Sequence, residues 1–85
     1  MDDKRKRLLF HCTHMGMKEN DVIFGGFADA HVADLSDADV ADLEALLRNN
    51  DLDLYNWVLE RAPVPDEWDT PVLRRVQMFN AGRAQ

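Results

Sequence analysis

The sequence is poor in the features that crosslink or anchor many small proteins. Its 85 residues include one cysteine, Cys12, so no disulfide can form within the chain. No apolar run approaches the length of a transmembrane helix. The basic stretch 4–7 is followed by only three apolar residues before His11, which is too few for a signal peptide. We therefore expect one cytosolic domain over 1–85, with no membrane insertion.

Groupings of catalytic or metal-binding residues are also scarce. His11, Cys12 and His14 are candidate metal ligands, but a zinc site normally needs three or four ligands and no second Cys/His cluster follows. Cys12 with His14 as its base would be a nucleophile that lacks a third, orienting group. Gly25 and Gly26 lie inside a helical pattern, so they do not form a phosphate-binding loop. The sequence predicts no catalytic site and no metal site, and gives Cys12 a core position.

Positive charge is scarce outside the first residues of the chain. The formal net charge is −6 at pH 7. Residues 1–18 have five Lys/Arg against two Asp, which gives +3, whereas 19–85 have five against fourteen acidic residues, which gives −9. An acidic domain binds nucleic acid poorly, so a nucleic-acid partner is not expected. We interpret the basic stretch 4–7 as the solvated start of a helix.

Apolar residues recur at helical spacing, and no segment shows the alternation of a strand. The sequence predicts an all-α fold, a small single-domain bundle of about five short helices joined by short loops. The expected helices span 4–13, 17–33, 37–48, 54–61 and about 71–80, and 81–85 is expected to fray. The predicted N-caps are Ser36 for the third helix, Asp51 or Asp53 for the fourth, and Thr70, before Pro71, for the fifth.

The second helix has the clearest pattern. Gly16 is expected to relieve the backbone at the preceding turn, and Glu19 and Asp21 to lie near the positive end of the helix dipole. Gly25 and Gly26 weaken the helix and are expected to make room for a crossing helix. The predicted apolar stripe of this helix consists of Val22, Ile23, Phe27 and Ala30, with Phe24 and His31 as further candidates. Leu8, Leu9 and Cys12 should share one face of the first helix, and Trp57 should lie in the core.

Several ordered segments together resemble a known family, the small flavinylation factors of succinate dehydrogenase, which include assembly factor 2 and its bacterial relatives. The matching segments are Gly16-x-x-Glu19, Asp21, Phe27-Ala28-x-x-His31, Leu46-Leu47, the segment 51–57 and Pro63-x-Pro65. The resemblance covers nearly the whole chain. The family motif is Arg-Gly-x-x-Glu, and this chain has Met15 where the arginine belongs.

The resemblance implies a protein that binds the flavoprotein subunit of succinate dehydrogenase, with fumarate reductase as a second candidate partner. It implies that this binding promotes covalent attachment of FAD to a histidine of the subunit. The linkage would form within the flavoprotein, so the factor would be no enzyme and would hold no cofactor tightly. A free monomer is the simplest state for a factor that docks and leaves. Such a factor would act in the bacterial cytoplasm, or in the mitochondrial matrix of a eukaryote.

The resemblance also implies which residues contact the partner. They are Met15, Gly16, Lys18, Glu19, Asp21 and Tyr55. Gly16 would let the partner backbone approach closely, and Glu19 would pair with a basic group. Lys18 and Asp21 are expected at the rim, and Tyr55 partly exposed nearby. Met15 can only pack where an arginine would donate charge-assisted hydrogen bonds.

The residues by themselves leave a second hypothesis open. A small acidic helical protein also suits a general interaction module, such as a toxin-neutralising partner of a basic protein. If the chain is a flavinylation factor, binding of its partner should depend on two positions, Gly16 and Glu19. If it is a general module, binding should depend on the acidic surface as a whole.

Overall fold

A computed structural model describes residues 1–83, and these residues form five α-helices and two short 3₁₀ turns. The elements are α1 (Asp3–Thr13), α2 (Lys18–His31), η1 (Val32–Asp34), α3 (Asp37–Leu46), α4 (Asp51–Val58), η2 (Asp66–Trp68) and α5 (Pro71–Arg83). No strand occurs in this part of the chain. The predicted all-α bundle is therefore confirmed.

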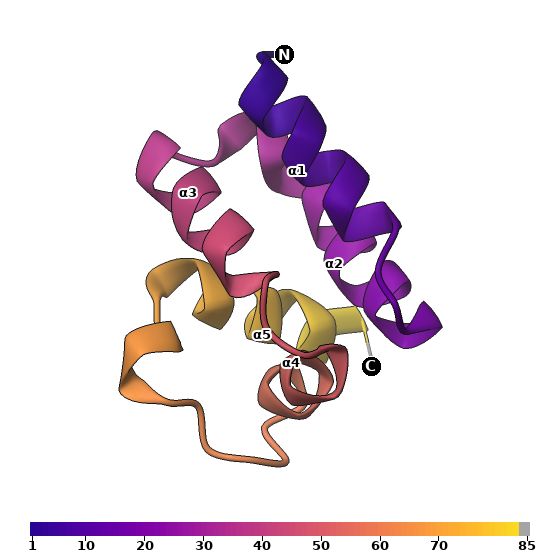
Figure 1. Ribbon diagram of the computed structural model, residues 1–85, viewed down its shortest axis with the longest axis vertical. Coiled ribbons are helices and arrows are strands. Elements are labelled where there is room, and N and C mark those ends of the chain that lie inside the picture. Colours follow the sequence, from indigo (N-terminus) through magenta and orange to yellow (C-terminus); the bar gives the residue numbers. More distant parts are fainter. Residues whose placement is uncertain (84–85) are drawn as a thin grey trace.

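The helices surround one core. α1 and α2 form an antiparallel pair, and α3 also contacts α1 (Figure 1). α5 contacts α2, α3 and α4, so the last helix closes the bundle. The core contains residues of all five helices, and the largest fully buried side chains, Phe24 and Phe27, belong to α2. The second helix is thus the one around which the others pack.

α1 and α2 approach closely at Gly25. A Cβ atom at this position would lie 3.2 Å from both the Cys12 carbonyl oxygen and Thr13 Cγ2. The expected packing role is therefore confirmed for Gly25. Leu8 and Cys12 are buried on the facing side of α1, as predicted.

The predicted apolar stripe of α2 is only partly correct. Ile23 and Phe27 are buried, whereas Val22 is 53% exposed and Ala30 is also exposed. The reason is that only one face of α2 packs on its neighbours, and these two residues lie outside that face. Trp57 of α4 is buried, as predicted.

The N-caps of α3 and α5 are confirmed. The Ser36 hydroxyl accepts a hydrogen bond from the Asp39 N–H (3.1 Å), and the Thr70 hydroxyl accepts one from the Leu73 N–H (3.3 Å). α5 nevertheless continues to Arg83, so the predicted end near Asn80 was wrong and 81–83 are helical rather than frayed. Ala81 favours helix and Gly82 opposes it, so local propensity does not fix where this helix ends. Residues 84–85, part of the segment expected to fray, lie outside the described residues.

The fourth helix differs from the prediction at both ends. α4 is Asp51–Val58, not 54–61, and its cap is Asn50, whose side chain accepts from the Leu52 N–H (2.8 Å). Both predicted caps, Asp51 and Asp53, were therefore wrong; asparagine caps as well as aspartate, so Asn50 could take this role one residue earlier. The helix ends early because Glu60 adopts a left-handed conformation (φ 58°), with the Arg61 N–H donating back to the Asn56 carbonyl (2.8 Å).

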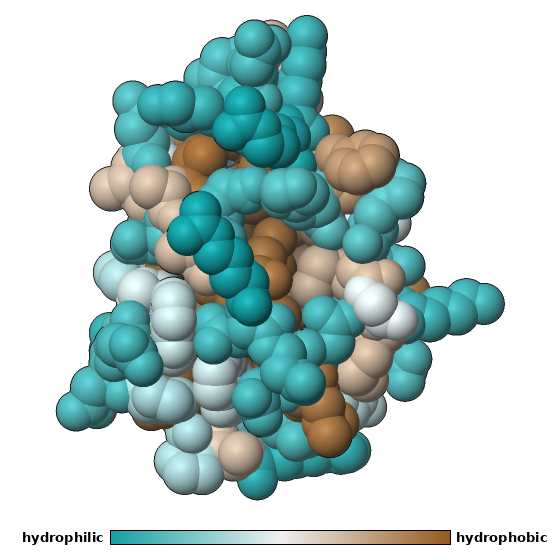
Figure 2. Space-filling model, viewed as in Figure 1, coloured by the Kyte–Doolittle hydropathy of each residue, from teal (hydrophilic) through white to brown (hydrophobic). Residues whose placement is uncertain are grey.

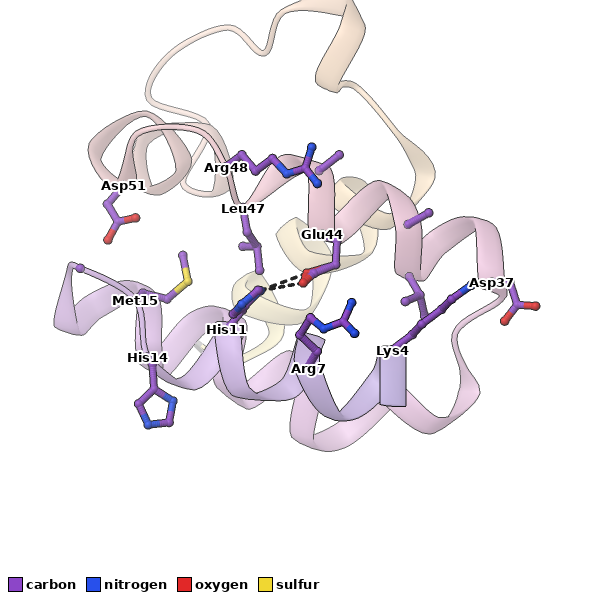
Figure 3. A pocket seen from close by; sticks show the side chains of 14 residues that line it. Lys4, Arg7, His11, His14, Met15, Asp37, Glu44, Leu47, Arg48 and Asp51 are labelled. Atoms are coloured by element: carbon purple, nitrogen blue, oxygen red, sulfur yellow. Dashed lines mark hydrogen bonds and ion pairs between the residues drawn. The ribbon is translucent and has the colours of Figure 1, made fainter. Parts of the chain in front are cut away.

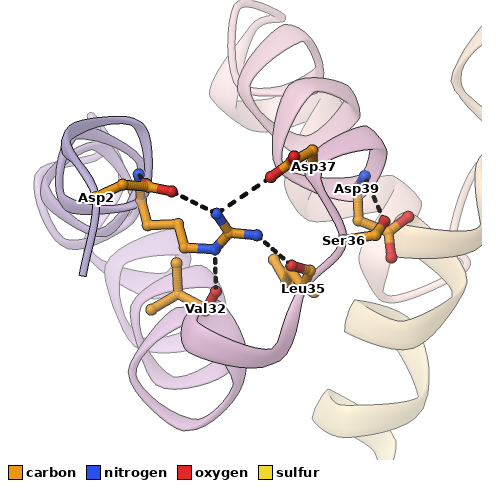
Figure 4. Close-up of polar contacts among 7 residues, drawn as sticks. Asp2, Val32, Leu35, Ser36, Asp37 and Asp39 are labelled. Atoms are coloured by element: carbon orange, nitrogen blue, oxygen red, sulfur yellow. Dashed lines mark hydrogen bonds and ion pairs between the residues drawn. The ribbon is translucent and has the colours of Figure 1, made fainter.

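The basic start of α1 was expected to be solvated throughout, and this prediction is wrong for one residue. Lys4, Lys6 and Arg7 are exposed, but Arg5 is half-buried. Its guanidinium group donates to the Val32 carbonyl (3.2 Å), the Leu35 carbonyl and the carboxylates of Asp2 (2.6 Å) and Asp37 (3.3 Å) (Figure 4). Arg5 thereby ties α1 to the η1–α3 connection, because a planar guanidinium offers five donors in a fixed geometry.

Candidate functional site

The predicted contact residues Met15, Gly16, Lys18 and Glu19 meet where the α1–α2 loop enters α2. Gly16, Lys18 and Glu19 are exposed, and Met15 is half-buried against the core. Glu19 and Asp21 lie in the first turn of α2, as predicted. Glu19 has no ion pair or side-chain hydrogen bond with any residue in 1–83, so its carboxylate is available to a partner.

Two carboxylates hold this loop. Asp21 accepts a hydrogen bond from the Met15 N–H, and Asp51 accepts one from the Met17 N–H (2.6 Å). The buried Asn20 side chain adds a third link, because its Nδ2 donates to the Asp51 carbonyl (2.8 Å). The loop is therefore fixed both to α2 and to the first residue of α4. Asp21, half-buried and engaged here, has a positioning role, and its role as a rim contact stays a prediction.

The structure gives a different reason for glycine at position 16 from the one expected. No glycine described has a positive φ, so the turn does not need the backbone freedom of glycine. A Cβ atom at Gly16 would instead lie 2.7 Å from Asp51 Oδ2 and 3.4 Å from Asp51 Cγ. The absence of a side chain therefore leaves room for the carboxylate that holds Met17.

Tyr55 lies apart from this loop within α4. It is half-buried, and the Arg61 guanidinium carbon lies 5.6 Å from the centre of its ring. It follows Asp51 by four residues, about 6 Å along the helix axis. The fold thus brings the helix that carries Tyr55 to the loop, while a contact of Tyr55 with a partner stays a prediction.

Asp51 and Asn20 are the residues that the sequence analysis missed. Asp51 was considered only as a helix cap, a role that fully accounts for an aspartate at that point of a sequence. Asn20 stands between two acidic residues, where burial is not expected. Gly16, which approaches Asp51, was no usable signal in the sequence, because a turn accounted for a glycine at that position.

The candidate metal ligands at the end of α1 do not converge. Cys12 is buried, His11 pairs with the Glu44 carboxylate (2.6 Å), and the His14 ring stacks on Phe10 (centroids 3.9 Å apart). Within residues 1–83, no group of three His, Cys, Asp or Glu side chains could hold a metal ion. None of the described helices is long and apolar enough to span a membrane.

Cys12 is predicted to be inert in the folded protein. Burial raises the pKa of its thiol from 9.0 to about 12, and the charge of Glu44 adds to this. The thiol form is favoured in the fold, so this stabilisation is present below pH 9 and is lost as the pH rises towards 12. At pH 8 we expect iodoacetamide to alkylate the native protein more than about 100-fold more slowly than the protein in 8 M urea. Similar rates in the two states would contradict the burial of Cys12.

A groove adjoins the loop. It lies between α1 and α3, has a volume of about 640 Å³, and has Met15, Gly16 and Asp51 at one end (Figure 3). We call it the α1/α3 groove. Its other lining residues are Lys4, Arg7, His11, His14, Asp37, Val40, Ala41, Glu44, Ala45, Leu47 and Arg48.

Comparisons with known proteins agree with the resemblance. Residues 6–80 match the model of a family described as the flavinator of succinate dehydrogenase. The chain is 41% identical over 73 residues to succinate dehydrogenase assembly factor 2, mitochondrial, of Dictyostelium discoideum, covering 86% of this chain and 52% of that protein. It is 37% identical over 73 residues to the FAD assembly factor SdhE of Acetobacter pasteurianus, covering 86% and 67%. The chain thus spans about half to two thirds of the length of these relatives.

Proposed function

This chain belongs to the family of succinate dehydrogenase flavinators, and we propose that it binds the flavoprotein subunit of that enzyme and promotes covalent attachment of FAD to it. The observation that carries the proposal is the family match over 6–80, which includes the exposed Gly16-x-x-Glu19 segment. The names of two similar proteins, an assembly factor and an FAD assembly factor, support the same role.

Binding alone is sufficient for this role. A protein that prefers one conformation of its partner increases the population of that conformation, and it needs no catalytic group to do so. In our proposal FAD remains in the flavoprotein, where the linkage forms. The exposed carboxylate of Glu19 would supply the charged contact, and Gly16 would keep the adjoining backbone accessible.

Met15 is the departure from the family motif. Its side chain is half-buried against the core, while its N–H is held by Asp21. An arginine in its place would have to direct its guanidinium group out of this apolar contact, as long cationic side chains commonly do. Because Asp21 binds the backbone of Met15, the loop does not depend on the side chain at this position. We therefore expect the chain to function with either residue.

The test measures covalent flavin on the flavoprotein subunit, by in-gel fluorescence, in cells that lack their own factor. We expect this chain to restore the fluorescent band and Met15→Arg to restore it at least equally. Restoration by Met15→Arg alone would support the family function but contradict our account of Met15. No restoration by either folded protein would overturn the proposed function and favour the general acidic interaction module.

A further inference from the structure

The α1/α3 groove combines an apolar floor with a basic edge. Lys4, Arg7 and His11 project from α1 towards α3, Arg48 follows the end of α3, and His14 points away (Figure 3). Figure 2 shows apolar surface between hydrophilic side chains on the face that carries α1 and α3. A groove of this composition suits a chain segment with both apolar and charged side chains.

The carboxylates of the groove are already engaged. Asp37 receives the Arg5 guanidinium (3.3 Å) and Glu44 the His11 ring (2.6 Å). Asp51, the third, accepts from a backbone N–H at the end of the groove (2.6 Å). Each acidic group that lines the groove therefore has a partner within the protein.

Three cationic side chains that line the groove, in contrast, have no partner among the described residues. Lys4, Arg7 and Arg48 have no ion pair and no side-chain hydrogen bond among residues 1–83. They lie together on a protein whose net charge is −6. Three unpaired cations around an apolar floor favour a ligand with carboxylates, since complementary charge sets the register and specificity of an interface.

We propose that the α1/α3 groove binds an acidic segment of the flavoprotein subunit, with carboxylates that face Lys4, Arg7 and Arg48. This inference rests on the proposed function and extends the contact at Gly16 and Glu19, because the groove ends at Met15 and Gly16. The acidic segment would run along α1 from the loop towards Lys4. Its apolar side chains would cover Ala41 and Leu47.

The test compares two neighbouring positions of α1. Arg7→Glu and Lys6→Glu change the net charge equally at exposed sites, but only Arg7 lines the groove. We measure the Kd for the FAD-loaded flavoprotein subunit of the same organism by calorimetry, with circular dichroism to confirm folding. We expect at least a tenfold increase in Kd, roughly, for Arg7→Glu and for Arg48→Glu, and less than about a twofold increase for Lys6→Glu. The difference should shrink at 0.5 M salt, where charges are screened.

Crosslinking identifies the occupant directly. Ala41 is exposed in the groove, and the buried Cys12 does not compete, so Ala41→Cys can be labelled selectively with a maleimide photocrosslinker. We expect the crosslinked peptide of the flavoprotein to be rich in Asp and Glu. A basic or neutral crosslinked peptide, or none although the complex forms, would overturn the groove proposal.

The affinities separate the two proposals. If the wild-type chain binds the flavoprotein subunit but Arg7→Glu and Lys6→Glu have equal Kd values, the groove proposal fails and the proposed function survives. If the wild-type chain does not bind the subunit at all, the proposed function fails and the groove proposal falls with it. A specific loss with Arg7→Glu and Arg48→Glu supports both.

Discussion

Gly16→Ala is expected to lower the free energy of unfolding by about 1–2 kcal/mol and to abolish binding of the flavoprotein subunit. Two opposing effects of the new methyl group determine the change in the free energy of unfolding. Because Gly16 has no positive φ, alanine would stabilise the fold by about 0.4–1 kcal/mol through the unfolded chain. Its Cβ, however, would lie 2.7 Å from Asp51 Oδ2, so the carboxylate must move and its hydrogen bond with the Met17 N–H is lost. The lost bond and the strain exceed the entropic gain.

A double-mutant cycle tests this explanation. Asp51→Ala removes the carboxylate that the new Cβ would meet, so Gly16→Ala should cost less in that background. We expect a coupling free energy of about 1 kcal/mol from urea denaturation of the four proteins, monitored by circular dichroism. Purely additive effects would show that Asp51 is not the reason for glycine at this position.

The same four proteins separate the two roles of Gly16. If glycine serves only to accommodate Asp51, the double variant should bind no worse than Asp51→Ala. If the partner backbone also approaches Gly16, the Cβ should weaken binding in both backgrounds. We expect the second result, because Gly16 is exposed and any partner at Glu19 must pass close to it.

The parts of the fold that sequence could predict are those decided by local chemistry. Ser36 and Thr70 indicate where helices begin, because each hydroxyl accepts a hydrogen bond from the backbone N–H three residues later. Gly25 indicates close packing because nothing else explains a glycine inside a helix. Where several residues could perform the same local task, as Asn50, Asp51 and Asp53 could, the boundary was misplaced.

The parts that could not be predicted depend on contacts between distant residues. Asp51 reaches Met17 across 34 positions, and Arg5 reaches Val32 across 27. Both have ordinary local explanations, as a helix cap and as a solvated basic residue, which hide the tertiary role. The predicted contact residues from Met15 to Asp21 follow one another closely in the sequence, so the resemblance could propose them together, and their contact with a partner stays a prediction. The sequence did not reveal that the Asp51 carboxylate holds this segment in shape.

Glu19→Lys is expected to weaken binding of the flavoprotein subunit at least 100-fold, roughly, while the protein remains folded. The structural cost is small, because Glu19 is exposed and has no partner in residues 1–83. Loss of a first-turn carboxylate costs about 0.3–1 kcal/mol of helix stability, which circular dichroism and urea denaturation can measure. The loss of binding would be much larger, because a lysine would face the basic group that Glu19 is proposed to pair with.

Asp29→Lys is the matched control for Glu19→Lys. Asp29 is an exposed carboxylate of the same helix, ten residues on, which is about 15 Å along the axis, and its reversal changes the net charge equally. We expect less than about a threefold change in Kd for this variant, since a screened charge at that distance contributes little. Equal losses from both substitutions would mean that binding depends on total acidic charge. That result would contradict a specific contact at Glu19 and favour the general acidic module. A loss confined to Glu19 instead assigns recognition to the start of α2, beside the loop that Asp21 and Asp51 hold.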